Sequence, residues 1–143
     1  MTQFAPPASK RTLWIGRVLS VIPIGMMLFS ASFKLHPSPQ IVEFTQTHLG
    51  YPATAFLTLA ILEISCVVLY AIPQTAVLGA ILMTGYLGGA IASHFRVGDA
   101  PFPPAILAIL AWAGLYLRDV RLRELIPLRK PSAISYQQSA KGL

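Results

Sequence analysis

Charged side chains are scarce in this sequence. Only 11% of its 143 residues are Asp, Glu, Lys or Arg, against about a quarter in an ordinary soluble domain. The chain has a single cysteine, Cys66, so an intrachain disulfide and a CxxC motif are excluded. It also lacks GxGxxG, Walker, GxSxG and HExxH motifs, and a soluble-enzyme mechanism therefore has no support. Hydrophobic residues make up 55% of the chain and the mean hydropathy is +0.63, which indicates that lipid is the main solvent.

Four apolar stretches follow one another along the chain. A membrane-spanning helix needs about 20 apolar residues, and the sequence predicts four such helices, at about residues 13–33, 53–72, 76–93 and 104–120. Their connections are short, so neighbouring helices should be antiparallel. The predicted fold is all-α: an integral membrane antiparallel four-helix bundle over residues 13–122.

The segments outside these stretches are more polar. Residues 1–12 are predicted to be a disordered cytoplasmic tail, and residues 123–143 a basic cytoplasmic tail. Between the first two spans, Ser38 is a suitable N-cap and Pro39 suits the first helical position. We therefore expect a short amphipathic helix in the first outer loop.

Positive charge gathers at the two ends of the chain. The formal net charge is +6, and nine of the eleven Lys and Arg residues lie near the termini, leaving Lys34 and Arg96 between them. Since short cytoplasmic segments carry the excess of Lys and Arg, both termini are predicted to be cytoplasmic. Basic ends of this kind contact anionic membrane lipid, and we expect no nucleic-acid partner.

Glu63 lies near the middle of the second apolar stretch. A carboxylate at the centre of a spanning helix costs about 2.5–3.5 kcal/mol on insertion scales, so Glu63 should be protonated, paired or directed into a polar interior. One interpretation is a proton carrier, or an acceptor for a hydroxyl or quinol headgroup. The other is a structural carboxyl that bonds Ser, Thr or Tyr of a neighbouring helix.

Further candidates for a ligand or proton site lie on the third stretch. Tyr86 and His94 share a helix face and Arg96 follows directly, an arrangement that suits a proton relay or an anion-attracting mouth. Alternatively, His94 and Arg96 are interfacial anchors, with a local ion pair between Arg96 and Asp99. Lys34, which ends the first span on the same outer side, has the same two interpretations.

Small residues form a stripe on the third stretch. Gly85 and Gly89 make a GxxxG pair that Ser93 extends. This pattern lets membrane helices approach closely, and it predicts a helix-packing seam rather than a ligand site.

Three histidines and two acids are expected on the outer side: His36, His48, His94, Glu43 and Asp99. A metal site built on one helix needs ligands spaced by about one turn. No two of the five have that spacing, and no metal is predicted.

Several of these segments together resemble the DoxX-like family of bacterial four-helix membrane proteins. The resemblance lies in residues 28–35, 48–52, 85–99 and 115–119, together with Glu63, and it extends over about residues 13–129. The segment 85–99 is the most specific of them. Ala31 or Ser32 occupies a place where the family is expected to have glycine.

The resemblance implies a four-span protein of the bacterial inner membrane with a link to quinones. The family's namesake is similar to a subunit of a quinone-reducing sulfur oxidoreductase, and relatives are associated with membrane oxidoreductase complexes. Among the candidate site residues, four match the family and are implied by the resemblance: Lys34, Glu63, His94 and Arg96.

Three hypotheses about function follow. The first is an accessory protein that binds a quinone or lipid near Glu63 and is not an enzyme on its own, because electron transfer would need a redox-enzyme partner or a bound cofactor. The second is a proton-coupled small-molecule transporter that acts as a homo-oligomer. The third is a structural membrane assembly factor whose polar residues only specify helix packing.

Overall fold

The computed structural model describes residues 9–126. In this range the chain forms six α-helices and one π-helix, with no β-strand, which confirms the all-helical prediction. The elements are α1 (Lys10–Leu35), α2 (Pro39–Glu43), η1 (Phe44–His48), α3 (Ala55–Ala71), α4 (Ala76–Arg96), α5 (Phe102–Arg118) and α6 (Val120–Leu125).

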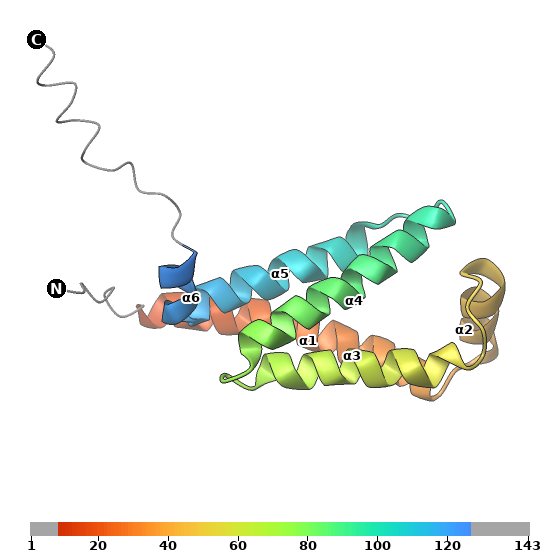
Figure 1. The fold of residues 1–143 in the computed structure, drawn as a ribbon, viewed down its shortest axis with the longest axis horizontal. Coiled ribbons are helices and arrows are strands. Elements are labelled where there is room, and N and C mark those ends of the chain that lie inside the picture. The colour runs from red at the N-terminus through yellow and green to blue at the C-terminus, as the bar shows by residue number, and fades with distance from the viewer. Residues whose placement is uncertain (1–8, 127–143) are drawn as a thin grey trace, which may run out of the picture.

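The four long helices contact one another in a cyclic order. Helix α1 packs against α3 and α5, and α4 packs against the same two helices. Figure 1 shows that the start of α1, the turn between α3 and α4, and α6 lie at one end of the molecule. Helix α2, η1 and the loop between α4 and α5 lie at the opposite end, which we call the loop end.

Large apolar side chains face outward from these helices. In α1 the buried face consists of small and medium residues such as Gly16 and Ala31, whereas Trp14, Val21 and Phe29 are each more than half exposed. Exposed apolar surface of this extent marks contact with a membrane or a partner. Helices α1 and α4 are long and apolar enough to cross a membrane, and α3 and α5 are shorter apolar helices of 17 residues each.

Close helix contacts gather at the end where the α3–α4 turn lies. A Cβ added to Gly79 would lie 2.2 Å from the Tyr70 backbone nitrogen, and one added to Gly114 would lie 2.5 Å from Ser20 Oγ. Because neither position has room for a side chain, glycine lets α4 approach α3 and lets α5 approach α1. The close contacts are therefore made by Gly79 and Gly114, and not by the predicted GxxxG pair.

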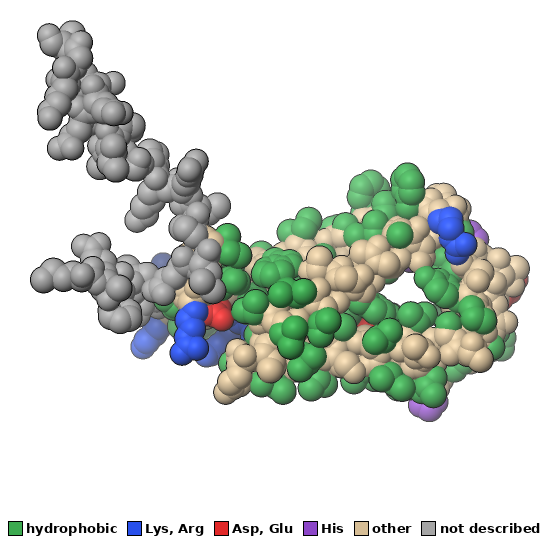
Figure 2. Space-filling view, viewed as in Figure 1, with side chains coloured by type: hydrophobic (Ala, Val, Ile, Leu, Met, Phe, Trp, Pro, Cys, Tyr) green, Lys and Arg blue, Asp and Glu red, His purple; other side chains and the backbone are tan. Residues whose placement is uncertain are grey.

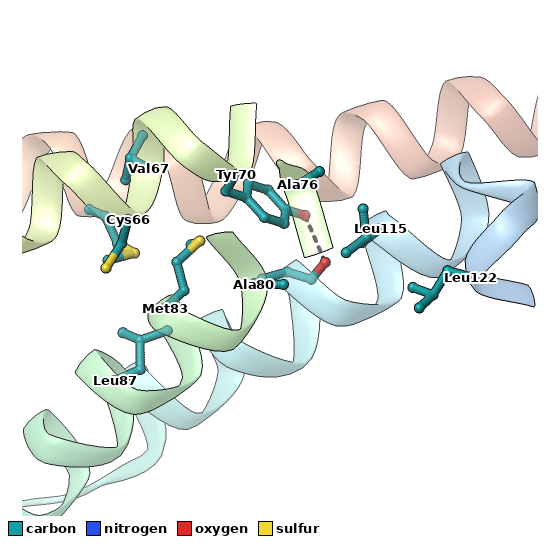
Figure 3. Packing of buried hydrophobic residues seen from close by; sticks show 11 residues of the cluster. Cys66, Val67, Tyr70, Ala76, Ala80, Met83, Leu87, Leu115 and Leu122 are labelled. Carbon is teal, nitrogen blue, oxygen red and sulfur yellow. Dashed lines mark hydrogen bonds between the residues drawn. The ribbon is translucent and has the colours of Figure 1, made fainter. Parts of the chain in front are cut away.

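Tyr70 stands at the centre of this contact region. Its ring is fully buried, and its hydroxyl donates to the Ala111 carbonyl at 2.7 Å and lies 3.0 Å from Ser20 Oγ. Figure 3 shows Tyr70 among buried side chains from α3, α4 and α5, including Met83 and Leu115. Through these two contacts Tyr70 of α3 joins α1, which carries Ser20, to α5, which carries Ala111.

Most boundaries of the long helices lie one to three residues from the predicted spans, and capping residues explain two of these differences. Helix α1 begins at Lys10, before the predicted start at Leu13, because Ser9 caps it by accepting from the Thr12 backbone nitrogen at 3.2 Å. The last span was expected to run without interruption to residue 120, but α5 ends at Arg118. Asp119 breaks the helix and caps α6, accepting from the Arg121 backbone nitrogen at 2.9 Å.

The helix expected after Ser38 is present. The Ser38 side chain accepts from the Ile41 backbone nitrogen, and Pro39 holds the first helical position. This helix continues directly into η1 as a π-helix, which the sequence did not indicate. Residues 1–8 and 127–143 of the two predicted tails lie outside the described residues.

Candidate functional site

A cavity of about 480 Å³ lies between the four long helices at the loop end. Figure 2 shows the molecule hollowed there, between the part formed by α4 and α5 and the part formed by α1 and α3. Most of its wall is apolar, with contributions from Met26, Met27, Phe33, Leu59, Leu87 and Leu107.

An ion pair lies in the wall of this cavity. Lys34 Nζ is 2.8 Å from Glu63 Oε2, and it also donates to Ser30 Oγ at 2.6 Å. Glu63 is 2% exposed. Lys34 belongs to the last turn of α1 and Glu63 to the middle of α3, so contact between these two helices brings the charges together. Each charge offsets the cost of burying the other.

The ion pair gives both residues a partner that the sequence did not indicate. Glu63 is paired rather than isolated on an apolar face. Lys34 turns inward to the carboxylate and is only 19% exposed in its side chain. Ser30, one helical turn before Lys34, supplies a further bond to the ammonium group.

Helix α4 contributes polar side chains to the same cavity. Tyr86, Ser93 and His94 all line it, together with Glu63 and Lys34. The structure thus gathers four of the five predicted ligand or proton residues around one space. Arg96, the fifth, does not line it; it is exposed, and its guanidinium donates to the Leu49 carbonyl.

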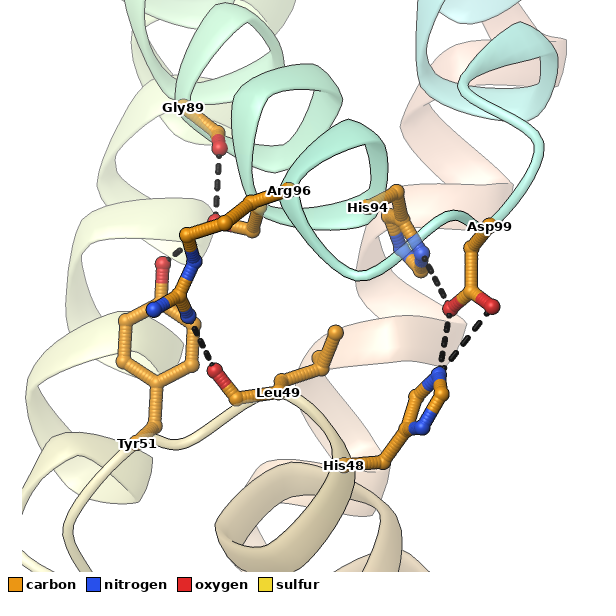
Figure 4. Close-up of polar contacts among 8 residues, drawn as sticks. His48, Leu49, Tyr51, Gly89, His94, Arg96 and Asp99 are labelled. Atoms are coloured by element: carbon orange, nitrogen blue, oxygen red, sulfur yellow. Dashed lines mark hydrogen bonds and ion pairs between the residues drawn. The ribbon is translucent and has the colours of Figure 1, made fainter.

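Two histidines converge on Asp99 beside the cavity. His48 Nε2 lies 3.0 Å from both Asp99 carboxylate oxygens, and His94 Nδ1 lies 3.3 Å from one of them. The bond with His48, supported by the one with His94, lowers the pKa of Asp99 below its ordinary value. Figure 4 shows His48 and His94 approaching the carboxylate from two different elements.

The expected local pair between Arg96 and Asp99 is wrong. Gly98 adopts a positive φ of 81°, a conformation that favours glycine, and the chain turns back so that the Asp99 backbone nitrogen bonds the His94 carbonyl at 3.0 Å. The carboxylate consequently faces the histidines, while Arg96 reaches Leu49 on the neighbouring loop.

Three contacts join the segment between α1 and α3 to the end of α4. They are His48 with Asp99, the Leu49 carbonyl with Arg96, and Tyr51 Oη with Ser93 Oγ at 2.6 Å. We call this set the latch (Figure 4). It holds α2 and η1 over the loop end of the cavity, where Ile41 and Phe44 form part of the wall.

The sequence did not indicate the roles of Ser30, His48 and Tyr51. Ser30 could have been found from its spacing of one turn before Lys34. His48 and Tyr51 contact residues that are more than 40 positions away in the sequence. A local sequence pattern cannot predict such contacts.

The predicted packing residues lie beside the cavity as well. Gly85, Gly89 and Ser93 line it, and a Cβ added to either glycine would meet no atom within 4 Å. Within the described residues the two glycines therefore contact no neighbouring helix closely, and packing against a second chain stays a prediction. No group of three His, Cys, Asp or Glu residues in residues 9–126 is arranged to hold a metal ion.

Comparison with known families gives one match. The sequence model of the DoxX-like family matches residues 18–114, a range that contains α3 and α4 in full and all of the cavity-lining residues named above. No curated protein and no solved structure matches the chain. The family match covers more than half of the 143 residues and confirms the resemblance seen in the sequence: the chain belongs to the DoxX-like family.

Proposed function

We propose that the protein is a multi-pass protein of the bacterial inner membrane that binds a quinone, or a similar neutral lipid-soluble molecule, beside Lys34 and Glu63. The observation that carries this proposal is an ion pair facing a cavity whose remaining wall is mainly apolar. Pockets for small molecules commonly combine an apolar lining with a few polar groups, in a volume of about 300–1,000 Å³.

The helix arrangement supports a four-span antiparallel bundle. Helices α1, α3, α4 and α5 run alternately between the two ends of the molecule (Figure 1). The 17 residues of α3 and of α5 extend about 25 Å at 1.5 Å per residue, which is close to the thickness of a bilayer core. Basic residues flank the end where α1 begins and α6 lies, and this supports cytoplasmic termini.

The charges of the site favour a neutral ligand head. The Lys34–Glu63 pair has no net charge, and an anionic headgroup near it would face the Glu63 carboxylate as well as the ammonium. A neutral head that carries oxygen can accept a bond from Lys34 Nζ, and a hydroxyl can donate to Glu63. A quinone offers carbonyl acceptors, and its reduced form offers hydroxyl donors.

The protein's own part in this proposal is binding and orientation. A bound quinone would supply the redox chemistry, and electrons would come from a partner oxidoreductase in the same membrane. The chain would then be an accessory subunit rather than an enzyme on its own.

Native mass spectrometry of the protein extracted in mild detergent tests the proposal. We expect wild type to retain a quinone or another neutral lipid-soluble molecule at close to one copy per chain. Glu63→Ala should lose it. Ser65→Ala is the matched control, because Ser65 lies on the same helix, is exposed, and bonds only the Ile61 carbonyl of its own helix. Retention in Glu63→Ala, or no bound molecule in wild type, would contradict the proposal.

Ligand retention, together with a measurement of proton-coupled uptake, also tests the two other hypotheses. Glu63→Gln keeps the shape of the side chain but cannot carry a proton. If Glu63→Gln binds the ligand as well as wild type does but loses proton-coupled uptake, this would favour transport. A protein that carries no ligand and only co-purifies with another subunit would favour an assembly role.

A further inference from the structure

We propose that the hydrocarbon chain of the ligand leaves the cavity sideways between α3 and α4, across Gly85 and Gly89. This inference rests on the proposed function, because it assigns a path to the tail of a molecule whose head lies at Lys34 and Glu63. It predicts that the site selects for tailed, lipid-soluble ligands over water-soluble ones with the same head.

The first step is that α3 and α4 diverge toward the loop end. Near their connecting turn they touch, since a Cβ on Gly79 would lie 2.2 Å from the Tyr70 backbone nitrogen. Two to three turns further along α4, a Cβ on either of the cavity-lining glycines Gly85 and Gly89 would meet no atom within 4 Å. Figure 1 shows the space between the two helices widening along α4, and Figure 2 shows the resulting opening.

The second step is that this opening is continuous with the cavity. Gly85 and Gly89 line the cavity, yet both are exposed. They are four residues apart and so lie one above the other on the same helix face. Since neither has a side chain, α4 leaves a passage from the ion pair to the outside of the molecule.

The third step is the surface onto which the passage opens. Leu62 on α3 and Ile81 and Leu82 on α4 are 42–53% exposed, so the outer surfaces of both flanking helices are apolar. The loop end of the cavity is covered by η1 and held by the latch. The sideways opening is accordingly the route that suits a hydrocarbon chain, which is stabilised where its CH₂ groups are kept from water.

A tail suits this opening better than a helix of a second copy does. A neighbouring helix would cover the glycines from outside but would leave the cavity behind them unfilled. A flexible chain attached to a head at Lys34 can follow the passage from the cavity wall to the surface.

The test compares two probes with the same head: decylubiquinone and its tailless counterpart 2,3-dimethoxy-5-methyl-1,4-benzoquinone. Binding is measured on the full chain in lipid nanodiscs for wild type, Gly85→Leu and Gly89→Leu. Gly88→Leu is the matched control, because Gly88 is equally open and lies on the same helix but does not line the cavity.

We expect Gly85→Leu and Gly89→Leu to weaken decylubiquinone binding about tenfold or more, which corresponds to at least 1.4 kcal/mol. The tailless quinone should change much less, and Gly88→Leu should leave both probes unaffected. An equal loss for both probes would mean that the leucine blocks the head, and it would overturn the proposed tail path.

Two other results would overturn the tail path while separating it from the proposed function. If decylubiquinone binds wild type and both leucine variants equally, the binding function stands and the path is wrong. If Gly89→Leu changes only the oligomeric state, the glycines form an interface between copies. If neither probe binds wild type, the proposed function itself fails.

Discussion

Lys34 and Glu63 form an ion pair inside the helix assembly. Glu63 is almost fully buried and the side chain of Lys34 is 19% exposed, so removal of one partner leaves the other charge with little solvent. Breaking a buried pair costs about 3–5 kcal/mol, whereas replacing both partners by apolar residues is often neutral. The lower end of that range applies here because Lys34 keeps some exposure.

We therefore expect Glu63→Ala to destabilise the protein by about 3 kcal/mol. The double variant Lys34→Met/Glu63→Leu should recover most of that loss, because no unpaired charge remains. Thermal unfolding in detergent of Lys34→Met, Glu63→Leu and the double variant measures the coupling. Additive losses would show that the two side chains do not interact.

Glycines of α4 offer a second residue-scale prediction. Gly79→Ala should unfold the protein or destabilise it by about 3 kcal/mol or more, since its Cβ would collide with the Tyr70 backbone. Gly88→Ala should be neutral or stabilising by about 0.5–1 kcal/mol, because its Cβ meets open space. Unfolding temperatures in one detergent compare the two, and equal effects would contradict the described contact between α3 and α4.

At this scale the sequence identified one half of the ion pair. Glu63 stands out because a carboxylate in an apolar run needs an explanation. Its partner could not be assigned, because Lys34 ends a span where an interfacial anchor is equally reasonable. Only the contact between α1 and α3 decides that its ammonium group turns inward.

At the scale of elements, the latch connects a short surface helix to the end of α4. Asp99 is its central acceptor, and its pKa is lowered chiefly by the hydrogen bond from His48. A group whose pKa is lowered on folding stabilises the fold fully above its ordinary pKa, and this contribution is lost as the pH falls through the lowered value. For Asp99 the ordinary value is 3.8, so the latch should hold at neutral pH and weaken in acid below it.

Asp99→Asn should loosen α2 and η1 at pH 7, because an amide oxygen accepts a weaker hydrogen bond than a carboxylate does. Hydrogen exchange of backbone amides in residues 39–48 should then become faster than in wild type. Glu43→Gln is the control, since Glu43 is exposed on α2 and makes no ion pair within the described residues. Equal exchange in wild type and Asp99→Asn would show that the latch does not hold these elements.

Local signals predicted some elements and missed others. Ser38 and Pro39 identified the start of α2 through ordinary capping chemistry. The π-helical continuation η1 and the break at Asp119 were not predicted. The first has no sequence signature. The second arises because the Asp119 side chain caps α6 instead of allowing α5 to continue. Composition alone assigns this position to the last span.

For the whole molecule, the topology is defined by the side of the membrane on which each connecting loop lies. In a Cys66→Ala background, His36→Cys and Gln74→Cys place a single thiol in each of two exposed loops at opposite ends of the molecule. A membrane-impermeant maleimide added to intact cells should label the first and not the second. Labelling of both, or of Gln74→Cys alone, would contradict a four-span arrangement with cytoplasmic termini.

The sequence predicted the number and order of the long helices because each coincides with a separate apolar run. It did not predict the cavity. Its position depends on where α3 and α4 touch and where they separate, and that is decided by Gly79 rather than by the GxxxG stripe that drew attention in the sequence.

The most direct test of the central claim is photo-crosslinking with a quinone that carries an azide on its ring, followed by mass mapping of the labelled peptides. We expect label on cavity-lining residues such as Leu59 and Tyr86, and loss of that label in Glu63→Ala. Label confined to outward-facing residues such as Leu57 and Ile61, or unchanged in Glu63→Ala, would contradict a binding site at the Lys34–Glu63 pair.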